Sequence, residues 1–594
     1  MPHELAHAED RLSDFTRDRR LIVISAMAVV VGAMSVGVAW SLLRLIALFT
    51  NLAFHHRLSA APAEPGAQPW MWMLAIPVLG GLAIGLLARF GSDKIRGHGI
   101  PEAIEAILFG RSRMDPRVAV LKPLSSAIAI GTGGPFGAEG PVIMTGGAFA
   151  SLFAQLFHLS SSERKTLLVA GAVGGMSAVF GTPLAAVLLA VELLLFEWRP
   201  RSFIPVAISA AVAGTLRAPL LGSGALFPVT PHAPLDGIGL VGAFGLGIIC
   251  GVGSGVLTTL VYFFEDLFQR VPIHWMWWPA LGGVAIGVGG LFEPRALGVG
   301  YPNIHDLLTG SLTGQSALVL LVVKALIWSI ALGSGTSGGV LAPLLMMGGA
   351  VGSALSPWLP LGDHGLWATI GMAAIMGGTM RSPLTAIAFA LELTHDLNLL
   401  PGLLVACIAS HGFTVLVMRR SILTEKIARR GRHIMREYAV DTLMLVRVGE
   451  VMDHDVQTLR ADTPLAKLAA RMSRHDTDVF RRDGLVLVDD GAEPVGIITR
   501  GDVLAALAED PPGWMLVSDA ASADLIVTYP DETLHDAALR MVRNGVGRLP
   551  VVTRGRKHTL VGYLGRGELL SARLTQYQDD HVREPGWLDR DARS

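Results

Sequence analysis

The chain has 594 residues, of which 51% are hydrophobic and only 16% charged, and its mean hydropathy is +0.50. Soluble proteins carry about 25% charged residues, so this composition excludes an ordinary soluble protein and indicates a polytopic membrane protein. The net charge of −1 averages an apolar N-terminal part and a charged C-terminal part. The sequence shows no basic cluster typical of nucleic-acid binding.

Apolar runs long enough to cross a hydrocarbon core of roughly 30 Å occur along the first 362 residues. They cover residues 21–43, 70–88, 166–191, 237–264 and 325–362. Several contain glycine and proline, and broken helices at membrane depth are typical of transporters, where they line a cavity. The first run lacks the cleavage site of a signal peptide, so we expect it to be a membrane span.

Basic residues flank the apolar part of the chain at both ends, which favours a cytoplasmic location for each end. They are Arg17, Arg19 and Arg20 before the first run, and Arg419, Arg420, Lys426, Arg429 and Arg430 after the last one. We therefore expect a multi-pass protein of the cell membrane, the inner membrane of a bacterium, with both termini in the cytoplasm. Cys250 and Cys407 lie in apolar runs, so we expect buried thiols and no disulfide.

A glycine-rich stretch at 131–147, GTGGPFGAEGPVIMTGG, contains a single carboxylate, Glu139. A helix beginning at Pro141 would direct unpaired N–H groups and its positive dipole end toward Glu139. Such a helix start can bind an anion without Lys or Arg. The Glu139 carboxylate would compete with that anion, so Glu139 is a candidate gate that opens when it takes a proton.

The apolar part contains an internal repeat. Residues 181–193, GTPLAAVLLAVEL, match 381–393, RSPLTAIAFALEL, and a glycine-rich segment that ends in proline precedes each copy: 137–141, GAEGP, and 339–343, GVLAP. Duplicated halves of transporters often have inverted topology, and their broken helices then form one site near the midplane. We expect an all-α membrane domain with an inverted two-fold repeat and broken helices.

Near Arg430 the composition changes to short apolar stretches between charged segments, which is typical of a soluble α/β domain. Here 463–472, TPLAKLAARM, aligns with 532–541, ETLHDAALRM, and a strand-like stretch follows each. These tandem modules resemble a pair of CBS domains. We predict a tail at 1–20, a membrane domain at 21–432, CBS domains within 433–574 (about 446–510 and 514–574) and a tail at 575–594.

The membrane region resembles the CLC family of chloride channels and anion/proton exchangers over roughly residues 20–432. The similar motifs are GHGIP at 97–101, GAEGP at 137–141, GVLAP at 339–343 and SILTEKIARRG at 421–431, in the family's order. The resemblance implies a homodimer in a lipid bilayer in which each subunit has its own pathway for chloride or another small anion. It implies that Glu139 is the gating glutamate and proton acceptor. The implied anion-binding positions are His98, Gly99, Ile100, Gly137, Ala138, Gly140, Val340, Leu341 and Leu423.

Several positions depart from the family pattern. His98 replaces the usual serine, Leu423 replaces the usual tyrosine, and Leu193 replaces the second glutamate that relays protons in exchangers. Ala138 and Leu341 also replace a basic residue and a phenylalanine. Each lost hydrogen bond to a charged ligand is worth roughly 1.5–3 kcal/mol, and His98 could supply a ring N–H or, when protonated, a positive charge.

The absence of a carboxylate at 193 favours a channel or a loosely proton-coupled carrier. The alternative is a strictly coupled anion/proton antiporter, for chloride or for fluoride, nitrate or bicarbonate. We interpret Glu192 and Glu392 as helix-capping or packing residues, and Lys122 either as a source of positive potential or as a membrane-edge anchor.

The CBS-like pair offers Thr499 and Asp502 in GIITRGD, at the spacing that holds a ribose in nucleotide-binding members, whereas the second copy offers Gly565 and Glu568. The CBS-like pair could bind an adenine nucleotide at Thr499 and Asp502, or it could serve only in dimerisation. The transport function itself requires no cofactor.

Two other classes of protein are less consistent with this sequence. HELAH at 3–7 fits the HExxH pattern of zinc proteases, but it lies in a polar tail without a third ligand nearby. A CBS-regulated cation transporter would need acids along its spans, and this membrane part has few. We therefore expect neither an enzyme nor a metal site.

Overall fold

The computed structural model describes residues 20–360, 363–432, 442–473, 484–489, 491, 493–509, 511–522, 524–555 and 558–572. The chain divides into two compact units, 1–433 with 583–594, and 434–582. The HELAH segment and the tail at 575–594 lie outside the described residues.

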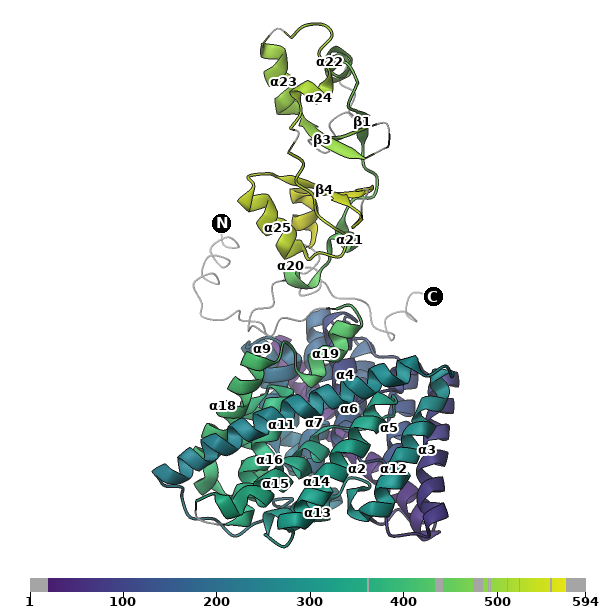
Figure 1. The fold of residues 1–594 in the computed structure, drawn as a ribbon, viewed down its shortest axis with the longest axis vertical. Helices are drawn as coiled ribbons and strands as arrows, with labels where there is room; N and C mark the ends of the chain where they lie inside the picture. Colours follow the sequence, from purple (N-terminus) through teal and green to yellow (C-terminus); the bar gives the residue numbers. More distant parts are fainter. Residues whose placement is uncertain are drawn as a thin grey trace. The chain divides into compact units, whose positions relative to one another are not determined.

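The first unit is a bundle of helices, several of them broken (Figure 1). Its first half contains α2 (Arg20–His55), α3 (Trp70–Phe90), η1 (Asp93–Ile95), α4 (Ile100–Leu108), α5 (Pro116–Gly131), α6 (Glu139–Gln155), α7 (Ser161–Phe180), α8 (Pro183–Leu189), the π-helical η2 (Ala190–Leu195), α9 (Pro200–Leu216) and α10 (Ala218–Leu221). α2 and the central helices α6 and α7 pack together in this half.

The second half repeats this order. It contains α11 (Gly237–Arg270), η3 (Trp275–Trp277), α12 (Trp278–Phe292), η4 (Pro294–Ala296), α13 (Tyr301–Leu308), α14 (Gly314–Gly333), α15 (Leu341–Leu355), η5 (Ser356–Trp358), α16 (His364–Met380), α17 (Pro383–Thr394), η6 (Leu397–Leu399), α18 (Leu400–Val417) and α19 (Ile422–Arg429). α4 and α13 begin at Ile100 and Tyr301, and α8 and α17 begin at Pro183 and Pro383, which are shifts of 201 and 200 residues. The duplication therefore extends well beyond the segments recognised from sequence.

Within the described residues, seven helical segments are long and apolar enough to cross a membrane. Two of the predicted apolar runs are broken, as their glycines and prolines suggested. Run 166–191 is divided between α7 and α8, because Gly181 adopts φ 69° and Pro183 starts the next helix. Run 325–362 is divided between α14 and α15 by the segment 334–340.

Glu192 and Glu392 cap helices of opposite halves. The Glu392 carboxylate accepts the N–H groups of Leu184 and Ala185 at 2.9 and 2.8 Å. The Glu192 carboxylate accepts those of Leu384 and Thr385 at 3.1 and 2.8 Å. This reciprocity is that of two copies related by an approximate two-fold axis, and it confirms the interpretation of both residues as helix caps.

The second unit contains two small α/β modules. The first has β1 (Thr458–Arg460), α22 (Leu465–Ser473), β2 (Gly484–Val488), β3 (Pro494–Thr499), α23 (Arg500–Ala508) and α24 (Val517–Ala520), and its strand order is β1-β2-β3. β2 pairs in parallel with β1 and antiparallel with β3. The second has α25 (Leu534–Arg543) and the antiparallel pair β4 (Arg548–Val552) and β5 (Leu560–Gly565), and the short helices α20 (Thr442–Leu445) and α21 (Val448–Val451) precede both modules in the chain.

Each module has its own apolar core, and the chain passes between them in a crossed manner. Leu443 and Val448, which precede the first module, pack in the core of the second with Leu534 and Leu549. Val517 of α24 packs in the core of the first module, to which it belongs. The two modules are therefore tied together by the segment 442–451, which precedes the first module and packs in the core of the second.

Candidate functional site

Two glycine-rich segments from opposite halves pair through their backbones. The N–H of Gly137 donates to the carbonyl of Gly339 at 3.2 Å, and the N–H of Gly339 donates to the carbonyl of Gly137 at 2.9 Å. A parallel bridge joins Gly97 to Ser337. The predicted motifs GHGIP, GAEGP and GVLAP are therefore brought together, although about 200 residues separate the third from the second.

The approach of the segments requires glycine. A Cβ at Gly140 would lie 2.0 Å from the carbonyl oxygen of His98, and a Cβ at Gly99 would lie 2.7 Å from the carbonyl oxygen of Gly140. Gly99 has φ 91°, which side chains other than glycine rarely tolerate. No larger residue fits these positions without displacing backbone.

Glu139 is the first residue of α6 and is completely buried. The helix thus begins two residues before the predicted start at Pro141. The carboxylate lies over the paired glycines, because a Cβ at Gly137 or Gly339 would meet its Oε2 atom at 1.7 or 2.9 Å. Neither oxygen makes a hydrogen bond of good geometry within the described part of the chain, although the N–H of Ala342 lies near. An unpartnered buried carboxylate is costly, and such groups mark functional sites.

The helix starts around Glu139 supply backbone donors. Val340 and Leu341 at the start of α15, Ala138 before α6 and Ile100 at the start of α4 are all fully buried. The N–H of Gly99, however, donates to the Glu102 carboxylate at 2.9 Å. Glu102 folds back onto its own helix start as an acid three residues into a helix often does. The Gly99 N–H, which we expected to donate to an anion, therefore already donates to a carboxylate of the protein.

His98 is 3% exposed and its Nδ1 atom has no hydrogen-bond partner among the described residues. Burial opposes a positive charge on the ring, and so do the nearby cationic groups of Lys426, Lys122 and Arg430, while Glu102 acts in the opposite sense. His98 can thus serve as a neutral ring with an unused nitrogen. Of the two sequence-based alternatives, this arrangement favours the ring N–H over the positive charge.

Lys122 is fully buried, so its interpretation as a membrane-edge anchor is wrong. Its Nζ donates to the carbonyls of Ile95 and Gly97 at 2.8 and 2.7 Å, which fixes the turn that presents His98. Sequence reasoning could not find these partners, because a buried lysine that binds carbonyls leaves no local pattern.

A cavity of about 850 Å³ extends to this turn and includes Glu102 in its wall. More basic than acidic side chains line it. The basic ones are Lys94, Arg96, Arg113, Lys426, Arg429, Arg430 and Arg432. The Arg96 guanidinium lies over the Trp275 ring at 4.6 Å from its centroid. A basic cavity whose wall includes Arg96 and Glu102, on either side of His98 in the sequence, would raise the local concentration of anions.

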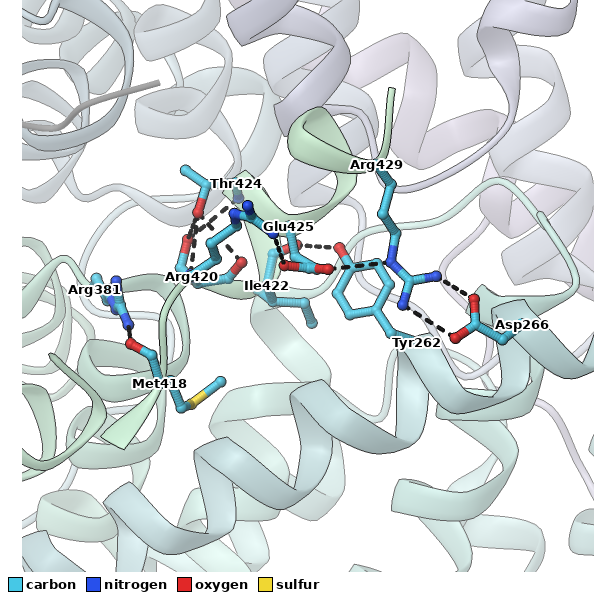
Figure 2. Close-up of polar contacts among 10 residues, drawn as sticks. Tyr262, Asp266, Arg381, Met418, Arg420, Ile422, Thr424, Glu425 and Arg429 are labelled. Carbon is cyan, nitrogen blue, oxygen red and sulfur yellow. Dashed lines mark hydrogen bonds and ion pairs between the residues drawn. The ribbon is translucent and has the colours of Figure 1, made fainter. Parts of the chain in front are cut away.

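The helix α19 carries Leu423, which is fully buried, so no hydroxyl is available at the position of the expected tyrosine. Figure 2 shows how α19 is held: Tyr262 of α11 donates to the carbonyl of Ile422 at 2.5 Å, and Arg429 pairs with Asp266 and Glu425. These contacts fix α19 beside the cavity, since Arg429 also lines it.

Leu193 is fully buried in the π-helical segment η2. The next acid along the chain is Glu197, which accepts a hydrogen bond from Ser202 at 2.5 Å and lies 3.7 Å from Lys165. Position 193 itself is an apolar leucine and carries no titratable group.

In the first CBS-like module, Thr499 and Asp502 form a reciprocal cap of α23. The Thr499 N–H donates to Asp502 Oδ2 at 2.7 Å, and the Asp502 N–H donates to Thr499 Oγ1 at 3.3 Å. In the second module the Gly565 N–H donates to Glu568 at 2.7 Å, without a hydroxyl at 565. The predicted difference between the two sites is therefore present in their local geometry.

A family model described as voltage gated chloride channel matches residues 79–414. The chain belongs to the CLC family. The CBS domain model matches twice, at 448–509 and 517–575. The resemblance inferred from the glycine motifs and the tandem modules is thereby confirmed.

Relatives and solved structures agree with this assignment. The chain is 30% identical over 423 residues to the voltage-gated ClC-type chloride channel ClcB of Escherichia coli O81 (strain ED1a), which covers 70% of this chain and all of the relative. The same figures apply to ClcB of Escherichia coli O157:H7.

Its fold is shared with a slow cyanobacterial Cl−/H+ antiporter (TM-score 0.61, 23% identity, covering 70% of this chain and 98% of the other). It is also shared with a eukaryotic CLC transporter (TM-score 0.61, 17% identity, covering 92% of this chain and 98% of the other). This CLC protein is thus a membrane protein for anion transport with a CBS pair.

Proposed function

We propose that this CLC protein conducts chloride or a related small anion past Glu139, whose carboxyl group acts as the gate and takes up a proton. One observation carries the proposal: the Glu139 carboxylate is fully buried and unpartnered over the paired segments of Gly137 and Gly339, within the described part of the chain. It occupies a place where helix starts favour negative charge. An anion that replaced the carboxylate would meet the same backbone groups.

The anion path in this proposal includes the helix starts at Val340, Leu341 and Ile100, with His98 as the neutral side chain beside them. The basic cavity gathers anions at the His98 turn. The glycines Gly137 and Gly140 and the residue Ala138 leave the backbone bare at the gate. Leu423 adds an apolar wall and no hydroxyl, so we propose that this site holds its anion chiefly through backbone groups.

Coupling to protons is the finer part of the proposal. Because Leu193 cannot relay protons, we propose a channel or a loosely coupled carrier, with a strictly coupled antiporter as the alternative. The titles of similar solved structures name a Cl−/H+ antiporter and a fluoride/proton antiporter, which keeps exchange and other anions as the second candidate.

The assembly and orientation are also proposals. We propose a homodimer with cytoplasmic termini and CBS modules in a cell membrane. In this proposal the partner subunit covers the surface of α8 and α17, where Leu184 and Leu384 beside the reciprocal caps are 56% and 47% exposed. An adenine nucleotide at Thr499 and Asp502 is the proposed ligand of the CBS pair.

The test is the reversal potential of purified protein reconstituted in liposomes, with chloride and proton gradients opposed. A reversal potential at the chloride equilibrium value would support a channel. A shift toward the proton equilibrium value would support exchange and refute the channel. Absence of any anion flux would refute the proposed function.

A further inference from the structure

Tyr301 lies in a second copy of the turn that presents His98. The segment 298–302, GVGYP, repeats the pattern of 97–101, GHGIP, at a shift of 201 residues. The buried Lys324 donates to the carbonyls of Ala296 and Gly298, both at 2.9 Å, as Lys122 does in the first copy. Tyr301 is the first residue of α13 and corresponds to Ile100. The second copy therefore presents a phenol where the first presents an aliphatic side chain.

The Tyr301 hydroxyl is buried and has no hydrogen-bond partner within the described residues. Its ring is held by aromatic contacts at its edges, with centroids 6.3 Å from Phe180 and 5.9 Å from Phe227. Phe180 and Phe227 are both buried, so the ring has little freedom to carry its hydroxyl to water. A buried hydroxyl left without a partner costs about 1–3 kcal/mol, so a second state in which this hydroxyl is bonded would recover that cost.

The Glu139 carboxylate is another buried group whose oxygens have no hydrogen-bond partner among the described residues. The charged groups that act on the Tyr301 phenol are the carboxylates of Glu139 and Glu64, and Lys324 acts on both carboxylates. Glu64 lies close to the second turn, since its Oε2 would be 3.8 Å from a Cβ at Gly298. Tyr301 is thus near Glu139 without touching it.

We propose that Tyr301 is the hydrogen-bond partner of the Glu139 carboxyl group when that group has left the paired glycines. This inference rests on the proposed function, in which Glu139 must vacate its place for an anion to pass. A phenol both donates and accepts a hydrogen bond, so it can receive the carboxyl group in its ionised or its protonated form. The two buried polar groups, which lack partners among the described residues in the present state, would then satisfy each other.

The experiment compares anion flux through liposomes for wild type, Tyr301→Phe, Glu139→Ala and the double variant. Tyr301→Phe keeps the ring and removes only the hydroxyl, and we expect flux to fall about two- to tenfold, the ratio that corresponds to one neutral hydrogen bond. In the Glu139→Ala background the same substitution should leave flux unchanged, because the partner is gone.

Tyr262→Phe is the matched control, since it also removes a buried hydroxyl from this unit, one bonded to Ile422. It should change flux by the same factor with and without Glu139. A fall caused by Tyr301→Phe that persists in Glu139→Ala would overturn the inference and assign the hydroxyl to the anion, and an unaltered flux would overturn it too. Wild type without flux would refute the proposed function together with this inference.

A structure of Glu139→Gln gives a second readout that does not depend on flux. The substituted side chain at position 139 should lie within hydrogen-bond distance of the Tyr301 oxygen. A side chain that stays over Gly137 and Gly339, or one that turns elsewhere, would overturn the inference.

Discussion

Lys122 and Lys324 occupy corresponding places in the two halves, and each buried ammonium group binds two carbonyls of a glycine turn. Each turn leads directly into a short helix, α4 or α13. The two lysines thus stabilise the backbone conformation of the turns, because each ammonium group donates its hydrogen bonds to backbone carbonyls of its turn.

Replacing either lysine by methionine should destabilise the protein. Lys122→Met and Lys324→Met each leave two buried carbonyls without a donor, and we expect a loss of about 2–4 kcal/mol in the free energy of unfolding. Thermal unfolding of the detergent-solubilised protein measures it. Lys94→Met is the control, because Lys94 is exposed and should change stability by less than about 0.5 kcal/mol. Equal effects at 94 and 122 would contradict this account.

Glu139→Gln should remove the pH dependence of transport. Gln is neutral at every pH and mimics the protonated gate, so flux should be high and flat, whereas wild-type flux should rise as external pH falls. Flux measured from liposomes across external pH of about 5–8 tests it. A variant that keeps the wild-type pH profile would show that the proton acts elsewhere.

Because Glu192 caps α17 and Glu392 caps α8, we expect substitutions of the two glutamates to destabilise the protein by similar amounts. Glu192→Gln and Glu392→Gln each weaken two charge-assisted bonds to backbone N–H groups, and we expect each to cost about 1–2 kcal/mol. Glu105→Gln removes a partly exposed ion pair with Arg430 and should cost less than about 1 kcal/mol. Unfolding in detergent compares the three. If Glu105→Gln proved as costly as the other two, the caps would have no special role.

Nucleotide binding by the CBS pair should depend on Asp502 and not on Glu568. We expect ADP to raise the unfolding temperature of the full chain, since a ligand that binds only the folded state stabilises it. Asp502→Ala should abolish that increase. Glu568→Ala, which removes the corresponding cap in the second module, should retain it. Absence of any shift in wild type would leave the pair without a nucleotide role.

The second CBS module should lose stability in acid. Burial raises the pKa of the Glu532 carboxyl, but hydrogen bonds from Arg540 and Thr528 outweigh burial and hold its pKa below the usual value. Because the folded pKa is depressed, this stabilisation is present above the unfolded pKa of about 4.3 and is lost as pH falls through the folded value.

Arg540→Met should therefore lower stability near neutral pH by about 1 kcal/mol and make less difference in acid, once Glu532 is protonated in the folded state. Calorimetry of the full chain, following the transition of unit 434–582, measures this dependence. A loss of equal size at both pH values would assign Arg540 a packing role instead.

The sequence predicted the glycine motifs, the gate candidate and the tandem modules, because each leaves a local pattern. It did not predict that Glu102 occupies the Gly99 N–H or that Lys122 binds carbonyls, since these contacts depend on how distant segments pack. Tyr301 was also missed, although the similarity of GVGYP to GHGIP at a shift of 201 residues could have revealed it. Contacts between halves are set by tertiary structure, and only the repeat carries a sequence signal for them.

The pairing of Gly137 with Gly339 has a consequence for how the protein is made. Translation delivers Glu139 to the membrane about 200 residues before Gly339, which completes its surroundings. Until then a carboxyl group at membrane depth has no enclosing partner, at a cost of a few kcal/mol. A chain that stops before Gly339 therefore carries Glu139 into the membrane without the segment that encloses it.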